Sequence, residues 1–188
     1  MLALIALLVV VASPTFVKLM RDRRVSRLSS QIVDYMRTAR TMAIGRGQPI
    51  LLSWNSAGKL AATFPGGTGF IEINEPLVTK NVAATTCSTT AWRTATTQQT
   101  ASFDLQSGKF EYAAATLYDD VKTSNVIAGA DICFSPSGRM YIRTGPAGAV
   151  VGAFAPVMGV PYFAVTNTDS NAVRTVYLMP NGTARVQL

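Results

Sequence analysis

The sequence predicts an α+β fold in which one long N-terminal helix packs against an antiparallel β head, built as a sheet or a sandwich. Three observations lead to this prediction. The chain opens with an apolar run, continues with a basic segment of helical periodicity, and then alternates short apolar runs with turn residues. The expected divisions are a membrane-embedded part of the N-terminal helix over 1–17, an amphipathic helix and junction over 18–47, and a β-rich head over 48–188.

The composition indicates one ordered domain with an appendage. The chain has 188 residues, of which 48% are hydrophobic and 14% are charged, against roughly 25% charged residues in an average soluble domain. The net charge is +7, and most of it lies within 18–46, where eight basic residues are opposed only by Asp22 and Asp34. A basic segment beside an apolar run favours anionic lipid headgroups or acidic partners. Nucleic acid is compatible with this charge but is not required by it.

Histidine, which takes part in many catalytic and metal sites, is absent from the sequence. Its absence excludes Ser-His-Asp and Cys-His triads and histidine-based zinc sites. Asp119-Asp120 and the pair Asp104 and Glu111 are the only carboxylate groupings, and no nucleophile with a neighbouring base can be named. We therefore expect no enzyme, no cofactor and no metal site.

The two cysteines, Cys87 and Cys133, lie 46 residues apart and form no CxxC motif. Two thiols cannot make a four-thiolate metal site. In an exported domain they could form a disulfide, whereas buried free thiols are also common. The sequence leaves both alternatives open.

Residues 1–17 fit three ordinary interpretations poorly. A secretory signal peptide would have a positive N-terminal region and a small-x-small cleavage site, which this segment lacks. A membrane-spanning helix over these residues would be short, at about 25 Å against a hydrocarbon core of roughly 30 Å. A soluble core helix of this composition would have to be buried on all sides. Pro14 is expected to kink or loosen the helix.

Residues 18–47 predict an amphipathic helix. Its apolar stripe recurs at alternating spacings of 3 and 4 and consists of Val25, Leu28, Ile32, Tyr35, Ala39 and Met42, widened by Val33, Met36 and Ala43. No Gly or Pro interrupts 17–44, and Gly45 with Gly47 supplies the stop. The C-terminal half of this stripe is expected to pack against the chain's own sheet.

The head is predicted as short strands separated by turns. The expected strands are Ile50–Trp54, Lys59–Phe64, Phe70–Ile73, Ala101–Leu105, Lys109–Tyr112, Asp131–Phe134, Met140–Arg143, Tyr162–Val165, Val173–Met179 and Thr183–Leu188. Two hairpins are the firmest predictions, one through Ser-Pro-Ser-Gly138 and one through Pro-Asn-Gly182, where Asn-Gly is expected to supply positive φ angles. Residues 80–100 read as an exposed loop or edge meander around Cys87 and Trp92, and 144–160 as a flexible loop.

Four segments together resemble type IV pilins and, more narrowly, the GspH/FimT type of pseudopilin or minor pilin. The apolar run ending in Ser13-Pro14-Thr15-Phe16 is similar to the second part of a pilin N-terminal helix. Ala39-Arg-Thr-Met-Ala-Ile-Gly-Arg-Gly-Gln-Pro-Ile50 is similar to that family's junction of helix and first strand. Ile132-Cys-Phe-Ser-Pro-Ser-Gly138 and Pro180-Asn-Gly182-Thr-Ala-Arg185 are similar to two of its strand-turn segments. Residues 55–130 resemble the family only in their alternation of short apolar runs and turn residues.

The resemblance implies a non-enzymatic, single-pass subunit of a bacterial inner membrane, with its head in the periplasm. Such subunits are cleaved and methylated by a prepilin peptidase and packed with other pilins into a type IV pilus or a type II secretion pseudopilus. Its implied assembly helix comprises Leu4, Leu7, Leu8, Val11, Pro14, Phe16, Val25, Leu28 and Ile32. The family's leader and glutamate are not seen here, so we expect a leader and roughly six to eight mature residues upstream of Met1, which would complete a span. The alternative is a divergent protein in which Ala6 replaces the glutamate and a deletion precedes Pro14.

Two further functions stay open. Some members of this family bind DNA through a basic C-terminal strand, and the corresponding candidates here are Arg139, Arg174 and Arg185, although Thr183 stands where the family has its first arginine. Arginines on a β face are more often solvated surface. The head could instead be a periplasmic binding or adhesion domain tethered to the membrane.

Overall fold

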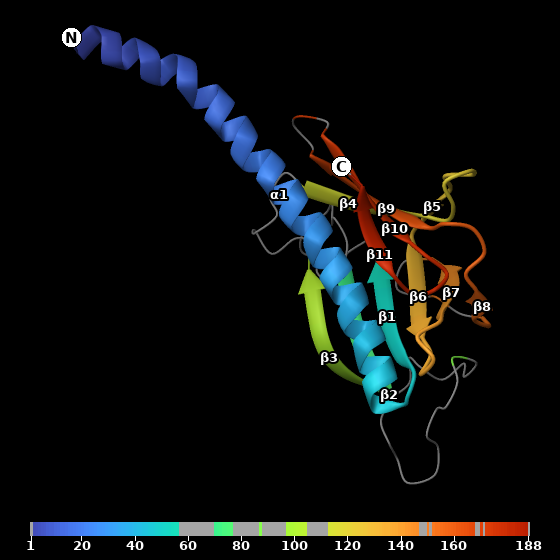
Figure 1. Ribbon diagram of the computed structural model, residues 1–188. Coiled ribbons are helices and arrows are strands. Elements are labelled where there is room, and N and C mark those ends of the chain that lie inside the picture. Colours follow the sequence, from blue (N-terminus) through green and yellow to red (C-terminus); the bar gives the residue numbers. More distant parts are fainter. Residues whose placement is uncertain are drawn as a thin grey trace.

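A single helix, α1 (Leu2–Arg46), opens the chain and runs alongside a head made of two antiparallel sheets (Figure 1). The computed structural model describes residues 2–56, 70–76, 87, 97–104, 113–146, 150, 152–167, 170 and 172–187, and of these only the backbone for 2–14, 21, 70–76, 97–104 and 113. One helix packed on antiparallel sheets confirms the predicted α+β class.

The C-terminal half of α1 is buried along one stripe. The stripe consists of Val25, Leu28, Ser29, Ile32, Met36, Ala39 and Ala43. Tyr35 and Met42, which we expected at its centre, are only partly buried. A helix turns about 100° per residue, so residues three or four positions apart lie on the same side. From Ile32 to Ala39, the stripe can therefore pass through Tyr35 or through Met36 with equal periodicity. The sequence pattern alone therefore could not choose between Tyr35 and Met36.

The backbone shows the effect of Pro14 on α1 and the way in which this helix ends. The helix stays continuous through Pro14, while its N-terminal end bends away from the line of the remainder (Figure 1). At the other end the last helical residue is Arg46, and Gly47 has a φ of 65°. This left-handed conformation is the usual glycine cap that ends a helix. Among the described residues, no helix combines the length and the apolar content that crossing a membrane requires.

The first sheet has six strands in the order β3-β2-β1-β6-β7-β8, and every neighbouring pair is antiparallel. Its strands are β1 (Ile50–Asn55), β2 (Phe70–Pro76), β3 (Thr97–Asp104), β6 (Gly129–Phe134), β7 (Met140–Gly145) and β8 (Ala155–Pro156). The central pair β1 and β6 is buried on the face toward α1 through Ile50, Leu52, Ala130 and Ile132.

The second sheet has five strands in the order β11-β10-β9-β4-β5, again antiparallel throughout. Its strands are β4 (Ala113–Tyr118), β5 (Val126–Ile127), β9 (Tyr162–Asn167), β10 (Val173–Leu178) and β11 (Ala184–Gln187). Phe163 from β9 meets Trp54 from β1 edge-on, with ring centroids 5.1 Å apart. One continuous core thus joins both sheets to α1.

Several strand predictions are confirmed, and others are wrong in instructive ways. Both predicted hairpins form, as β6–β7 and β10–β11. Residues 80–100 were expected to be an exposed loop or an edge meander, and β3, which begins at Thr97, is an edge strand of the first sheet, whereas Cys87 is buried. The expected loop over 144–160 contains the short strand β8, and β4 and β5 were not foreseen. The predicted strands 59–64 and 109–112, and Trp92, lie outside the described residues.

The two hairpins use the same turn. In each, the amide of the glycine donates to the carbonyl three residues earlier, from Gly138 to Ser135 and from Gly182 to Met179, at 2.8 Å. Each glycine is left-handed, with φ of 76° and 79°, while Asn181 is not. The expectation that Asn181 also has a positive φ was therefore wrong. Proline before Asn181 favours the ordinary right-handed first turn residue, so only the glycine bulge needs a positive φ.

Replacing Gly182 with alanine is expected to lower the free energy of unfolding by about 2 kcal/mol or more, since a left-handed L-residue alone costs about 1–2 kcal/mol. In addition, the new Cβ would collide with the Gly138 carbonyl oxygen. Gly45→Ala is the matched control, because it has free space around it and lies in α1. That change is expected to stabilise the protein by about 0.5–1 kcal/mol. Denaturant unfolding would measure both; equal effects of the two changes would contradict the role given to the turn.

Candidate functional site

The part of α1 before the head carries large apolar side chains on its surface. Phe16 is 61% exposed, Val17 42%, Leu19 50% and Met20 46%. They lie on the segment that leads out of the head (Figure 1). Exposed apolar side chains gathered in this way are typical of surfaces that contact other molecules.

Asp22 marks the point at which α1 meets the head. One carboxylate oxygen of Asp22 accepts hydrogen bonds from the Asn167 side-chain amide at 2.9 Å and the Ser170 hydroxyl at 2.7 Å. Asn167 ends β9 and is buried, and the first buried helix residue, Val25, follows one turn after Asp22. This contact fixes the projecting segment relative to the second sheet.

The Asp22 contact is expected to make this attachment sensitive to acid. The Ser170 hydrogen bond is the main cause that lowers the pKa of Asp22; loss of hydration opposes it, while Asn167, Lys18 and Arg174 add to it. A lowered folded-state pKa means that the stabilisation is complete above the unfolded-state pKa, about 3.9, and is lost as pH falls through the folded-state value. Asp22→Ala should therefore lower the thermal midpoint at pH 7, and this effect should be smaller at pH 2.

Asp34→Ala is the matched control for this prediction, because Asp34 is exposed on the same helix. It should leave the midpoint unchanged at both pH values, as most exposed surface substitutions do. An Asp22→Ala effect that persisted unchanged at pH 2 would show that the charge of the carboxylate is not what holds the helix.

The residues expected to form the assembly helix divide into two groups. Leu4, Leu7, Leu8, Val11 and Pro14 lie on α1 before the head, where only the backbone is described, and Phe16 is exposed. Val25, Leu28 and Ile32 are buried against the chain's own sheets. The head therefore covers these three side chains, and their part in assembly stays a prediction. The open surface ends before Val25.

Cys87 and Cys133 form a disulfide, with their Cα atoms 5.9 Å apart. Cys133 lies on β6, on the face of the first sheet that points away from α1, and Cys87 packs there with Leu51, Tyr141 and Phe154. Of the two alternatives that the sequence left open, the structure thus shows the bonded one. The bond ties residue 87 to the centre of the sheet.

The three arginines considered for DNA contact do not share a face. Arg139 follows the β6–β7 turn, and Arg185 on β11 is paired with Tyr177 on β10. Because side chains alternate along a strand, Arg174 lies on the opposite face of β10 from Tyr177, and its charge acts on Asp22 of α1. The basic β face expected from the sequence is therefore not formed by these residues.

Sequence reasoning missed a row of tyrosines on the outer face of the second sheet. Tyr118, Tyr162 and Tyr177 are direct cross-strand partners, and Arg185 continues the row. The rings of Tyr118 and Tyr162 stack on each other, with centroids 4.8 Å apart and planes at 11°. Because these rings pack against each other across neighbouring strands, the row of tyrosines stabilises strand pairing. Only knowledge of the strand register could have found it.

The paired carboxylates Asp119 and Asp120 build a turn. The Asp119 carboxylate accepts hydrogen bonds from the backbone and side chain of Asn125 and from the Thr123 hydroxyl, at 2.9–3.0 Å. The Asn125 side-chain bond is the main cause that lowers the pKa of Asp119. Asp120 accepts from the amide of Val160 at 3.0 Å. Both groups thus hold the loop after β4. Of the other carboxylate pair, Asp104 ends β3 and Glu111 lies outside the described residues.

Comparisons with protein-family models, with curated proteins and with solved structures give no match for this chain. Within the described part of the chain, no three Cys, Asp or Glu side chains gather as metal ligands would. The projecting end of α1 is the feature from which a function can be inferred.

Proposed function

We propose that the protein is a structural minor pilin or pseudopilin subunit of the GspH/FimT type, held in the bacterial inner membrane and then packed at the tip of a type IV pilus or a type II secretion pseudopilus. One observation carries the proposal. A single 45-residue helix is buried in its own head from Val25 onward and exposes large apolar side chains from Phe16 to Met20. A helix that served only the head would have no use for the exposed part.

The two parts of α1 would have different roles, the first in lipid and helix packing and the second in holding the head. The first part would lie in the lipid before assembly and against the helices of neighbouring subunits afterwards. Leucine-rich helix surfaces and lipid tails are equally apolar, so one surface can serve both states. From Leu2 to Val17 the helix is about 24 Å long at 1.5 Å per residue. Lys18 and Arg23, both exposed, would then lie at the level of the lipid headgroups.

The second half of α1 would keep the head in a fixed position on this rod. Its buried stripe contacts strands of both sheets, and Asp22 ties it to the end of β9. A rigid attachment is needed if the packing of helices is to set the positions of heads in a filament. The disulfide and the shared core support the same role, since exported proteins are commonly stabilised by such bonds.

Charged substitutions on the exposed segment test this proposal. We expect Phe16→Asp combined with Leu19→Asp to reduce recovery in the membrane fraction, and co-purification with pilin-like subunits, by more than about tenfold, because the carboxylate at position 16 would lie in lipid and the one at position 19 among the headgroups, where it offsets the neighbouring basic side chains. Met158→Asp is the matched control, because Met158 is 84% exposed on the head. All three side chains are exposed, so the thermal midpoint of the head should not change.

The result would decide between this proposal and a tethered binding domain. Loss of both membrane recovery and pilin-like partners in the double variant, with neither lost in Met158→Asp, supports the pilin-like subunit. A wild-type chain that stays in the membrane without any pilin-like partner favours the tethered binding or adhesion domain. An equal loss in the Met158→Asp control would contradict the role given to the projecting segment.

A further inference from the structure

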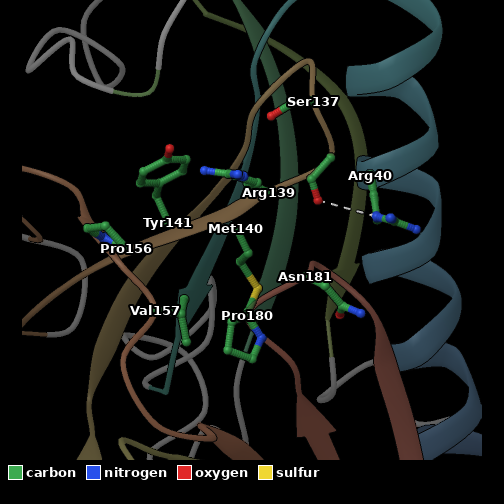
Figure 2. Close-up of a pocket in the computed structure, with 10 residues that line it drawn as sticks. Arg40, Ser137, Arg139, Met140, Tyr141, Pro156, Val157, Pro180 and Asn181 are labelled. Carbon is green, nitrogen blue, oxygen red and sulfur yellow. Dashed lines mark hydrogen bonds between the residues drawn. The ribbon is translucent and has the colours of Figure 1, made fainter.

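A pocket of about 480 Å³ opens where the C-terminal end of α1 meets the two hairpin turns. Figure 2 shows Arg40 entering from α1, Ser137 and Arg139 from the β6–β7 turn, and Asn181 from the β10–β11 turn. Val157, just after β8, closes the remaining side. Segments from four parts of the chain thus build one cavity.

The glycines of the two turns explain why the pocket forms. Gly182 packs so closely against the Gly138 carbonyl that no Cβ would fit between them. This carbonyl in turn accepts a hydrogen bond from Nε of Arg40 at 3.3 Å (Figure 2). This bond holds Arg40 against the β6–β7 turn, so Arg40 forms the wall of the pocket beside α1. The sequence offered Arg139 as a DNA or anion contact, but the separation of 98 residues between Arg40 and Gly138 explains why it could not join Arg139 to the rest of this site.

The lining of the pocket combines positive charge with an apolar floor. Two arginines, Arg40 and Arg139, line it, and none of its lining residues is acidic. The floor is apolar and includes Met140 and Val157, both buried, with Tyr141 and Pro156 beside them. A smaller cavity on the other side of the β10–β11 turn adds Arg37. No carboxylate forms an ion pair with Arg40 or Arg139 among the residues that the structure describes.

We propose that this pocket binds a small organic anion, in which a carboxylate or phosphate group is attached to an aromatic or branched apolar body. The guanidinium group of Arg139, which extends toward Tyr141 (Figure 2), would hold the anionic group, because guanidinium pairs with planar or tetrahedral oxyanions through charge-assisted hydrogen bonds. The apolar body would lie on Val157, Tyr141 and Pro156. Ser137 and Asn181 supply further polar groups at the rim. This inference does not depend on the role proposed for α1.

Titration of the detergent-solubilised full chain with phenyl phosphate, benzoate and inorganic phosphate, followed by amide NMR shifts, tests the site. We expect phenyl phosphate to bind at least about tenfold more tightly than inorganic phosphate, since the ring buries apolar area. Benzoate should shift the same amides, because it joins an anionic group to the same ring. The largest shifts should fall on 137–141, 157 and 181. Arg139→Gln should weaken phenyl phosphate binding by roughly tenfold, as expected for the loss of a charged hydrogen-bond partner.

Arg185→Gln is the matched control, because Arg185 is an exposed arginine that does not line the pocket. It should leave the affinity unchanged, and both variants should keep the thermal midpoint of the wild type, since Arg139 is exposed as well. Equal weakening in the two variants would mean that only net charge matters and would overturn the site. Equal affinity for inorganic and phenyl phosphate, or no shifts at these residues, would also overturn it.

Discussion

Removing the disulfide is expected to lower the free energy of unfolding by about 4 kcal/mol. The bond between Cys87 and Cys133 closes a loop with a sequence separation of 46, and the entropy of closing a loop of this length in the unfolded chain gives about 4 kcal/mol. Both sulfur atoms are also packed, because Cys87 is 5% exposed and Cys133 is fully buried. Denaturant unfolding of the Cys87→Ala, Cys133→Ala double variant, compared with the oxidised wild type, measures the effect.

Reduction of the wild type supplies the control for this prediction. The reduced wild type and the double variant should unfold at similar denaturant concentrations, since both lose the same constraint. The small apolar cluster around the bond, with Leu51, Tyr141 and Phe154, should loosen in both. A double variant as stable as the oxidised wild type would mean that residue 87 does not need to be held against the first sheet.

Asp131→Ala is expected to destabilise the protein by about 3–5 kcal/mol, because it would leave a buried arginine without its partner. Asp131 is fully buried and Arg143 is 5% exposed. The Arg143 guanidinium donates to Asp131 Oδ2 from two nitrogens, at 2.9 and 3.0 Å. Ser53 also donates to Oδ1 of Asp131, and Phe154 packs against the guanidinium at 4.4 Å. Chemical unfolding would measure the loss.

The double variant Asp131→Ala, Arg143→Met separates the lost charge pair from lost packing. It should recover most of the stability, because replacing both members of a buried pair by apolar groups is often neutral. A double variant as unstable as Asp131→Ala alone would show that the hydrogen bonds from Ser53 and to the Gly152 carbonyl, and not the unpaired charge, account for the effect.

Local sequence rules predicted the parts of the fold that local interactions determine. The periodic stripe and the glycine at 47 predicted the packed half of α1 and its end. The Pro-x-Gly turns predicted both hairpins. Strand β4 was missed because its sequence, Ala-Ala-Ala-Thr-Leu-Tyr, has weak strand propensity and is a strand through its pairing with β9.

The contacts that build the sites lie between residues far apart in sequence. Asp22 meets Ser170 across 148 positions, and no local pattern connects them. The Asp131–Arg143 pair is different. Once the turn is known to close with Ser135 and Arg139, counting outward along the hairpin places Asp131 opposite Arg143. Reading the turn type from Ser-Pro-Ser-Gly would therefore have predicted that Asp131 and Arg143 are cross-strand partners.

Site-specific photocrosslinking tests most directly whether the projecting end of α1 is an assembly surface. A photoreactive amino acid would replace Phe16 in one full-length variant and Met158 in another, each expressed in the native organism. Both positions are exposed, so the reactive group is accessible in each. Crosslinks from position 16 to pilin-like subunits, identified by mass spectrometry and absent from position 158, are the expected result. No such crosslink from position 16, in cells where pilin-like subunits are expressed, would contradict the proposal.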